Sequence, residues 1–214
     1  MPGSGSKFPV LQAILDVDAS ATAGWSVQDL AAAFLDGGAT FIQIRAKALP
    51  AGAFLQLCDH VVRAAAPYAA AVIVNDRVDL AIMSGAGGVH VGQDDLAPKA
   101  ARQLLGEEKI VGYSTHDVAQ VTAALAEPVS YVAVGPVFGT QTKATGYDPV
   151  GLELVAEASR LARGLPIVAI GGITLETAPR VLAAGASCVA VIGDLLAGGD
   201  PAGRITAYRR ALGL

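Results

Sequence analysis

Short apolar runs alternate with longer segments of helical period along the whole chain, and the alternation repeats about every 25 residues. Runs such as Ile167–Ile170 are apolar at every position, which is typical of a parallel strand covered by helices on one face and barrel layers on the other. The pattern predicts strands at Leu11–Leu15, Thr40–Arg45, Ala71–Asn75, Gly88–Val91, Ile110–Tyr113, Tyr131–Val134, Ile167–Ile170 and Cys188–Ile192. It predicts helices at Ser26–Asp36, Ala51–Ala64, Val78–Ser84, Ala97–Leu105, Asp117–Leu125, Val150–Arg163, Leu175–Ala184 and Pro201–Leu212. Each predicted strand is therefore followed by a helix, as in repeated β-α units.

Glycine marks the return from helix to strand, as at Gly37-Gly38, Gly106 and Gly185. Eight β-α units in a chain of 214 residues predict the α/β class and a single (β/α)8 TIM barrel, with a doubly wound open sheet as the alternative. No linker or second composition interrupts the series. We therefore expect a flexible N-terminal tail over residues 1–8 and one barrel-type catalytic domain over residues 9–214.

Composition and charge exclude several classes of function. Hydrophobic residues make up 53% of the chain, and 15 basic against 19 acidic side chains give a net charge of −4. Without a cluster of Lys and Arg, a nucleic-acid partner is not expected. No apolar stretch approaches the roughly 20 residues of a membrane span, and no export signal is visible, so we expect a cytoplasmic protein without a membrane partner. Cys58 and Cys188 lack the spacing of a zinc site and are expected to be buried thiols.

Polar residues gather on one side of the predicted strands. In barrel enzymes the active site lies at the carboxyl ends of the strands. The residues that follow those ends are Asp16 and Asp18, Gln43 to Lys47, Asn75 and Asp76, Gln93 to Asp95, Ser114 to His116, Gly135 to Lys143, Gly171 to Thr174, and Gly193 with Asp194. The opposite ends carry mostly Gly, Ala and Pro. This asymmetry is the strongest indication of a site in the sequence.

Gln43, Arg45 and Lys47 recur with period two, so we expect them on the same strand face, directed into the mouth of the barrel. Two cations beside an amide suit phosphate oxygens, and an anion clamp is the favoured interpretation. The alternative is a layer of salt bridges at the barrel end, with Asp16 or Asp76 as the partners.

Asp76 and Asp95 follow neighbouring strands, so their carboxylates are expected close enough to share one Mg²⁺. Mg²⁺ takes one or two protein carboxylates and fills its other positions with water and substrate phosphate. The structural alternatives are an ion pair of Asp76 with Arg77 or Arg45, and a helix N-cap for Asp95.

Gly171-Gly172 and Gly193 follow the last two strands, where barrels commonly bind a phosphate on backbone N–H groups. Thr140, Thr142 and Lys143 add hydroxyl donors and a cation in a long loop. The role of His116 stays open, because it follows a strand end but could also begin a helix. His90 and His60 are expected in a barrel layer and on a helix.

Taken together, these motifs resemble thiamine-phosphate synthase. The stretches that carry the resemblance are Gln43 to Lys47, Val74 to Asp79, Gly88 to Asp95, Gly112 to His116, Gly135 to Lys143 and Ala169 to Thr174. The resemblance implies a Mg²⁺-dependent condensation of an aminopyrimidine methyl diphosphate with thiazole phosphate, which gives thiamine phosphate and pyrophosphate. It implies binding of the pyrimidine diphosphate by Gln43, Ile44, Arg45, Ala46, Lys47, Asn75, Ser114 and Lys143, with Arg45, Lys47, Ser114 and Lys143 as the catalytic residues. It implies binding of the thiazole phosphate by Thr140, Gln141, Thr142, Gly172, Ile192 and Gly193, and of the metal by Asp76 and Asp95.

The chain departs from the family pattern at three places. The first strand, Leu11 to Asp16, lacks the Tyr and the Thr that family members usually show before the Asp, and Ala46 replaces a frequent acidic residue. Gly193 replaces a common Ser, and the charge of Asp194 beside it is unfavourable for a phosphate unless the carboxylate points away. A thiazole tautomerase-like isomerase and a non-catalytic phosphate-binding barrel are the alternative functions. Barrels of this size often pair, so a homodimer is a further expectation.

Overall fold

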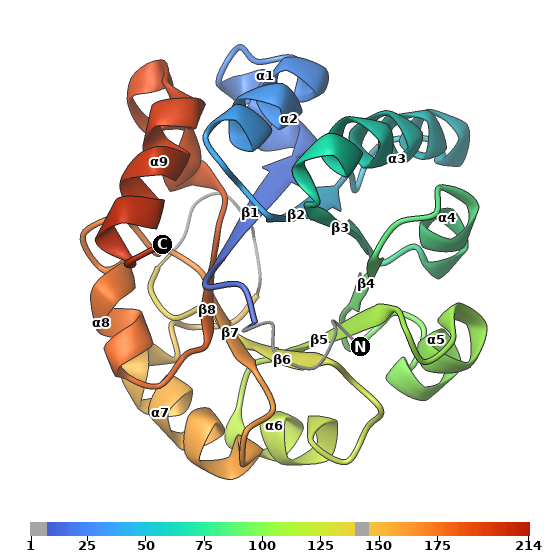
Figure 1. Ribbon diagram of the computed structural model, residues 1–214. Coiled ribbons are helices and arrows are strands. Elements are labelled where there is room, and N and C mark those ends of the chain that lie inside the picture. Colours follow the sequence, from blue (N-terminus) through green and yellow to red (C-terminus); the bar gives the residue numbers. More distant parts are fainter. Residues whose placement is uncertain (1–7, 140–145) are drawn as a thin grey trace.

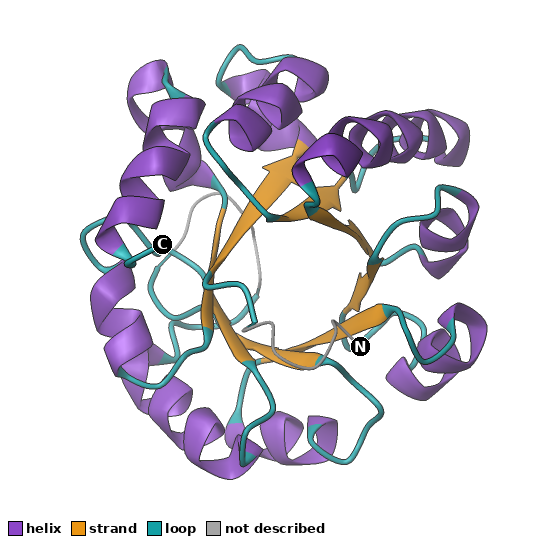
Figure 2. Ribbon diagram, viewed as in Figure 1, coloured by secondary structure: helices purple, strands orange, loops and turns teal. Residues whose placement is uncertain are grey.

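The computed structural model describes residues 8–139 and 146–214, which form a closed barrel of parallel strands inside a ring of helices (Figures 1 and 2). In this part of the chain the strands are β1 (Leu11–Asp16), β2 (Phe41–Arg45), β3 (Ala71–Asn75), β4 (Gly88–Val91), β5 (Ile110–Thr115), β6 (Tyr131–Val134), β7 (Ile167–Ile170) and β8 (Cys188–Val191). Each strand pairs with its neighbours in sequence, and β1 also pairs with β8, with Leu11 opposite Val189. This closure confirms the (β/α)8 barrel and is incompatible with the open sheet.

Over residues 8–139 and 146–214, the outer ring contains the eight predicted helices and one that the sequence did not predict (Figure 1). They are α1 (Val17–Thr22), α2 (Val27–Asp36), α3 (Ala51–Ala65), α4 (Val78–Met83), α5 (Pro98–Leu105), α6 (Val118–Ala124), α7 (Gly151–Ala162), α8 (Ala178–Ala183) and α9 (Pro201–Ala211). Two 3₁₀ helices, η1 (Ala66–Tyr68) and η2 (Gly193–Gly199), were also not predicted. Helix α8 begins three residues later than expected, because Thr174 and Thr177 form a hydrogen-bonded turn in front of it.

Side chains alternate between two hydrophobic layers. Odd positions of β1, such as Ala13 and Leu15, pack outward in the core beneath the helices. The inward layer of apolar side chains consists of Ile14, Phe41, Ile73, Tyr131, Ala133, Val168, Cys188 and Ala190. At the amino ends of the strands the ring of Phe8 packs on Phe41 and Tyr131, with centroids 5.6 and 5.7 Å apart. The sequence analysis placed Phe8 in the tail, but its ring is part of the barrel floor.

Local capping accounts for several helix starts. The side chains of Ser26, Asp117 and Asp200 each accept a hydrogen bond from a backbone N–H in the first turn of α2, α6 and α9. Asp16 does the same for α1, where its Oδ1 accepts from the N–H of Ala19 at 2.9 Å. The last residue of β1 therefore also starts the next helix, which fixes its carboxylate at the mouth of the barrel.

Both cysteines are buried free thiols, as the sequence predicts. Cys58 lies in the outer core, where burial raises its pKa to about 12. Cys188 lies in the inward layer, and complete burial raises its pKa as well. Among the described residues, no helix has the length and apolar character to span a membrane.

Arg102 on α5 ties together the loops at the floor of the barrel. Its Nη1 donates to the carbonyl oxygens of Gly106, Glu107 and Lys109, and its Nε donates to that of Pro128 at 3.1 Å. Its Nη2 donates to the hydroxyl of Ser130 at 3.0 Å. Arg102 is only 8% exposed, although Gly106, Glu107 and Pro128 lie at the surface. Its buried guanidinium therefore serves as a cross-link between the loops that enter β5 and β6.

We predict that Arg102→Met lowers the free energy of unfolding by about 3 kcal/mol, because it removes the hydrogen bonds by which a buried charged group joins two loops. Urea unfolding at equilibrium measures this change. Arg160→Met is the control, since Arg160 is exposed and pairs only with Glu157 on its own helix. Equal midpoints for the two variants would contradict the role given to Arg102.

Candidate active site

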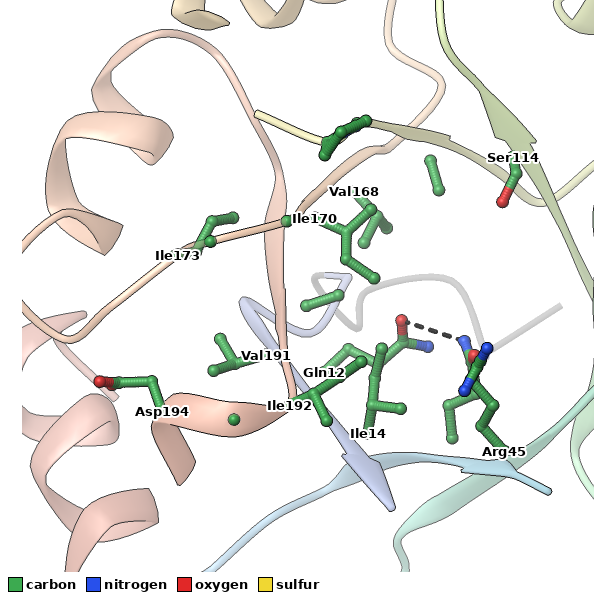
Figure 3. A pocket seen from close by; sticks show the side chains of 18 of the residues that line it. Gln12, Ile14, Arg45, Ser114, Val168, Ile170, Ile173, Val191, Ile192 and Asp194 are labelled. Atoms are coloured by element: carbon green, nitrogen blue, oxygen red, sulfur yellow. Dashed lines mark hydrogen bonds between the residues drawn. The ribbon is translucent and has the colours of Figure 1, made fainter. Parts of the chain in front are cut away.

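A cavity of about 460 Å³ opens at the carboxyl ends of the strands, on the side where the sequence gathers its polar residues (Figure 3). Its deeper wall carries Gln12, Gln43, Asn75, His90 and Ser114. Its opposite wall is apolar and contains Ile170, Ile173 and Ile192, together with the glycines that follow β6, β7 and β8. The cavity thus has one polar wall and one apolar wall, an arrangement typical of a small-molecule site.

A chain of hydrogen bonds crosses the polar wall inside the barrel. Gln43 Nε2 donates to Gln12 Oε1, and Gln12 Nε2 donates to the Tyr131 hydroxyl, both at 3.5 Å. The two nitrogens of the His90 imidazole lie 2.9 Å from the Tyr131 hydroxyl and 2.8 Å from the Ser114 hydroxyl. The chain therefore links Gln43 on β2 to Ser114 on β5 through side chains that are almost entirely buried.

The sequence predicts that Ser114 follows the end of a strand, but in the structure Ser114 lies within β5. The strand continues to Thr115 because Ser114 and Thr115 keep their pairing with Ala133 and Val134 of β6. The side chain of Ser114 therefore has a fixed inward direction, and Figure 3 shows its hydroxyl turned toward the open space beside Gln12 and Arg45.

Arg45 lines the cavity and is held by Asp16. One Arg45 Nη1–H donates to Asp16 Oδ2 at 2.5 Å, and the side chain of Asp16 is only 2% exposed. Arg45 Nε is buried, and no hydrogen-bond acceptor reaches it among residues 8–139 and 146–214. The salt bridge with Asp16, which was the alternative to an anion clamp, is therefore present. It still leaves one buried donor of the guanidinium without an acceptor.

Asp76 and Asp95 lie together at the rim, as the sequence predicts. Asp76 has a left-handed backbone, with φ of 64°, which directs its side chain away from the line of β3. Burial raises the pKa of the Asp76 carboxyl, Lys47 opposes this, and the neighbouring Asp95 carboxyl raises it further. Asp95 Oδ2 accepts the backbone N–H of Gly92 at 2.7 Å and does not cap α5. The helix-cap alternative for Asp95 is therefore wrong.

Lys47 lies at the rim and does not line the cavity. Strand β2 ends at Arg45, so the expected alternation does not continue to residue 47. The side chain of Lys47 is 50% exposed, and its Nζ donates to Asp76 Oδ2 at 2.5 Å. Asp76 thus pairs with Lys47, whereas Arg77 pairs with Asp79 and Arg45 with Asp16. The alternative ion pair of Asp76 with Arg77 or Arg45 is wrong.

Ile44 and Ala46 place their side chains in the outer core. Ile44 alternates with the inward residues of β2, and Ala46 follows the end of that strand. Neither side chain reaches the cavity. Any contact of these two residues with a ligand would use the main chain.

Gly172, Ile192 and Gly193 line the cavity at the ends of β7 and β8, as expected. Gly172 has φ of 62°, and a Cβ there would lie 2.5 Å from the carbonyl oxygen of Gly139. Only glycine allows the two loops to approach this closely. The helix expected directly after Gly172 begins only at Ala178, so the main chain itself forms this wall.

The carboxylate of Asp194 points away from the cavity (Figure 3). Its oxygens accept from Arg204 Nη2 at 2.8 Å, from the Tyr208 hydroxyl at 2.6 Å and from the backbone N–H of Leu175 at 3.0 Å. Burial and the Asp194 carboxylate raise the pKa of Tyr208. Because α9 neutralises the charge of Asp194, the unfavourable effect on a phosphate that the sequence raised does not apply.

His116 also lines the cavity, but its ring is already engaged. Its Nδ1 donates to the carbonyl oxygen of Gly135 at 2.6 Å, and the imidazole stacks on Tyr147 with centroids 3.8 Å apart. His60 is exposed on α3, as predicted. Thr140, Gln141, Thr142 and Lys143, which the sequence places at the site, lie outside the described residues.

Comparison with known proteins identifies the family of the chain. The model of the thiamine monophosphate synthase family matches residues 13–195. The chain belongs to the thiamine monophosphate synthase family. A thiamine-phosphate synthase of Koribacter versatilis is 41% identical over 217 residues, which cover 98% of each chain. One of Anaeromyxobacter dehalogenans is 46% identical over 171 residues, which cover 80% of this chain and 76% of the relative. The solved structure of a thiamine phosphate pyrophosphorylase from Pyrococcus furiosus superposes with a TM-score of 0.85 at 27% identity over 95% of each chain.

Two wall residues, Gln12 and His90, lie outside the site that the sequence predicts, and so does Tyr131, which hydrogen-bonds to both. A histidine within an apolar strand is indistinguishable from a packed core residue in the sequence, and Tyr131 is fully buried. Strand periodicity could have identified His90, because it is on the same face of its strand as Gly88, and that face must point inward if Val89 and Val91 face the helices.

Gly112 makes room for this part of the site. A Cβ at residue 112 would lie 2.1 Å from Tyr131 Cζ and 2.6 Å from His90 Nδ1. The close approach of β5 to these two rings therefore requires a residue without a side chain.

We predict that Gly112→Ala lowers the free energy of unfolding by about 2 to 3 kcal/mol, because the methyl group overpacks the interior. Gly52→Ala is the matched control. A Cβ at residue 52 of α3 meets nothing within 4 Å, so the change should stabilise the helix by about 0.5 to 1 kcal/mol. Denaturant titration of both variants measures the difference. Destabilisation of both proteins to the same extent would contradict the packing described for residue 112.

Proposed function

We propose that the chain joins an aminopyrimidine methyl diphosphate to a thiazole phosphate and releases thiamine phosphate and pyrophosphate. The observation that carries the proposal is the meeting of anion-binding donors and paired carboxylates at one cavity of a family member. Arg45 and Asn75 line that cavity, while Lys47, Asp76 and Asp95 lie at its rim. The names of the relatives supply the reaction.

The diphosphate would bind between β2 and β5. Arg45 supports this placement, because its buried Nε would gain an acceptor that the described residues do not give it. Gln43, Asn75 and Ser114 add donors on the same wall, and Ile44 and Ala46 are proposed to contact the diphosphate through their main chain. Lys143 is proposed as a further cation for the diphosphate. The salt bridges of Arg45 with Asp16 and of Lys47 with Asp76 hold both cations in position before a ligand arrives.

The pair of Asp76 and Asp95 fits Mg²⁺. A hard cation prefers carboxylate oxygens, and a cation between these two groups would oppose the burial and the neighbouring Asp95 carboxyl, which both raise the pKa of Asp76. No group of three or more His, Cys, Asp or Glu side chains with metal-site geometry occurs in the described chain. The protein would thus supply two ligands, and water and diphosphate oxygens the others. When bound, the ion would offset charge on the leaving diphosphate.

The chain's own residues would act by position and charge. The bond between the methylene carbon and the diphosphate oxygen breaks, and its electron pair leaves with pyrophosphate. The aminopyrimidine stabilises the resulting cation, and the lone pair of the thiazole nitrogen forms the new carbon–nitrogen bond. Arg45, Lys47 and Lys143 would stabilise the charge on the departing oxygens, with Ser114 as an additional hydrogen-bonding group. No protein nucleophile or general base is needed, so catalysis depends on holding the two substrates in line.

The thiazole phosphate would bind at the other wall. Gly172, Gly193 and Ile192 lie there, and the main chain at the two glycines can approach a phosphate without obstruction by a side chain. Thr140, Gln141 and Thr142 are proposed as further contacts. This arrangement would place the two substrates on opposite sides of one cavity, with the reacting atoms between them.

Purified protein supplied with both substrates and Mg²⁺ is expected to form thiamine phosphate and pyrophosphate in equal amounts, and EDTA should stop the reaction. Chromatography of thiamine phosphate and a coupled pyrophosphate assay measure the products. Absence of thiamine phosphate would overturn the proposal. Conversion of a thiazole phosphate alone would favour the isomerase instead.

Asp76→Asn and Asp95→Asn should each lower turnover roughly 100-fold or more, because each removes one negative ligand from the metal. Asparagine also tolerates the left-handed backbone at residue 76. Mn²⁺ binding, measured by electron paramagnetic resonance, should weaken in both variants. Asp79→Asn is the control, since its carboxylate faces Arg77 at the surface. Unchanged Mn²⁺ affinity in both site variants would remove the metal assignment.

A further inference from the structure

The buried hydrogen-bond chain has a direction that can be worked out from its members. Gln12 Nε2 donates to the Tyr131 hydroxyl oxygen, and an amide nitrogen can only donate. Tyr131 is fully buried, which raises the pKa of its phenol, so the hydroxyl keeps its proton. The oxygen of Tyr131 therefore accepts from the Gln12 amide, and its O–H has to donate elsewhere.

His90 is the acceptor for that proton. Its Nδ1 lies 2.9 Å from the Tyr131 hydroxyl, so Nδ1 carries the lone pair and the neutral imidazole carries its hydrogen on Nε2. Nε2 lies 2.8 Å from Ser114 Oγ and donates to it. Stacking of the two rings, with planes 19° apart and centroids at 5.6 Å, keeps this alignment. The hydrogen bond from the Tyr131 hydroxyl to Nδ1 thus determines the tautomer of His90.

Ser114 is the last member of this hydrogen-bond chain. Its Oγ accepts from His90, and its main-chain carbonyl accepts from Gln93 Nε2 at 2.6 Å. The one remaining hydrogen of the hydroxyl is then available to the cavity, into which Ser114 faces (Figure 3). Reversal of this hydrogen-bond chain would require the Tyr131 oxygen to accept two hydrogens, from Gln12 and His90, and would leave its own proton without an acceptor among the described residues.

We propose that His90 and Tyr131 are positioning residues which hold the Ser114 oxygen by one lone pair and leave its O–H to donate to a ligand atom that carries no hydrogen. Such an acceptor is a ring nitrogen of the pyrimidine or an oxygen of its diphosphate. The inference extends the proposed function by naming what sets the polarity at Ser114.

The tautomer can be measured without any enzyme assay. In a long-range ¹H–¹⁵N spectrum of the protein, His90 is expected to show a protonated Nε2 and an unprotonated Nδ1. The chain contains three histidines, so His60→Asn and His116→Asn assign the His90 signals by elimination. A His90 with its proton on Nδ1 overturns the proposal, whatever reaction the protein catalyses.

A double-mutant cycle tests the link to the ligand. Tyr131→Phe removes only the hydroxyl, and it should raise the KM for the pyrimidine diphosphate about tenfold while the KM for thiazole phosphate stays unchanged. Ser114→Ala should show at least the same loss. The double variant should be no worse than Ser114→Ala, because Tyr131 acts through Ser114. Tyr68→Phe is the matched control, since that hydroxyl pairs with Asp36 at the surface. Additive losses in the double variant overturn the proposal.

Binding of fragments separates the two acceptor atoms. Calorimetry with inorganic pyrophosphate and with the hydroxymethyl aminopyrimidine is compared for the wild type and Ser114→Ala. Weaker pyrophosphate binding in the variant assigns the diphosphate oxygen, and weaker pyrimidine binding assigns the ring nitrogen. If the wild type and Ser114→Ala bind pyrophosphate with the same affinity, and also bind the pyrimidine with the same affinity, the role of the Ser114 hydroxyl as a donor is overturned. If the wild type makes no thiamine phosphate, the proposed reaction fails, while the spectrum and these titrations still decide the polarity of the chain.

Discussion

A closed barrel of parallel strands allows no water-exposed edge inside, so every polar group in its interior must find a partner in the barrel or in a ligand. The apolar layer with its Phe8, Phe41 and Tyr131 floor excludes solvent from below. Above it, Gln12, Gln43 and His90 satisfy one another within the protein. The cavity begins where this mutual satisfaction ends, at Ser114 and Arg45. The requirement for partners thus determines which donors are left for a ligand.

Charge at the mouth follows the same rule. Arg45, Lys47 and Arg204 each face a carboxylate of their own, namely Asp16, Asp76 and Asp194. Pairs of this kind contribute little to stability when they are exposed. Their value lies in geometry, because a cation that is already oriented loses less freedom when an anion arrives. A chain with a net charge of −4 can therefore hold a polyanion through locally arranged groups.

The sequence predicts most of the fold because strands covered on both faces are apolar throughout, as in β6 and β8. Helix α1 was not predicted, because its six residues show no helical periodicity of apolar side chains and the helix depends on Asp16 as its N-cap. Among cavity residues within strands, the sequence predicts Gln43, Arg45, Asn75 and Ser114 but not Gln12 or His90. His90 looks like a core residue until its two ring nitrogens are seen between Tyr131 and Ser114. Pairings such as Lys47 with Asp76 depend on where β2 ends, which hydrophobic periodicity locates only to within a residue or two. The expected homodimer stays a prediction.

The two thiols lie in different layers of the molecule, Cys58 under the helices and Cys188 inside the barrel. Burial keeps both protonated at neutral pH, so neither reacts as a thiolate while its layer is closed. Alkylation of Cys58 would report detachment of α3 from the barrel wall, and alkylation of Cys188 the parting of the strands themselves. The natural chain thus contains separate chemical reporters for the opening of its shell and of its centre.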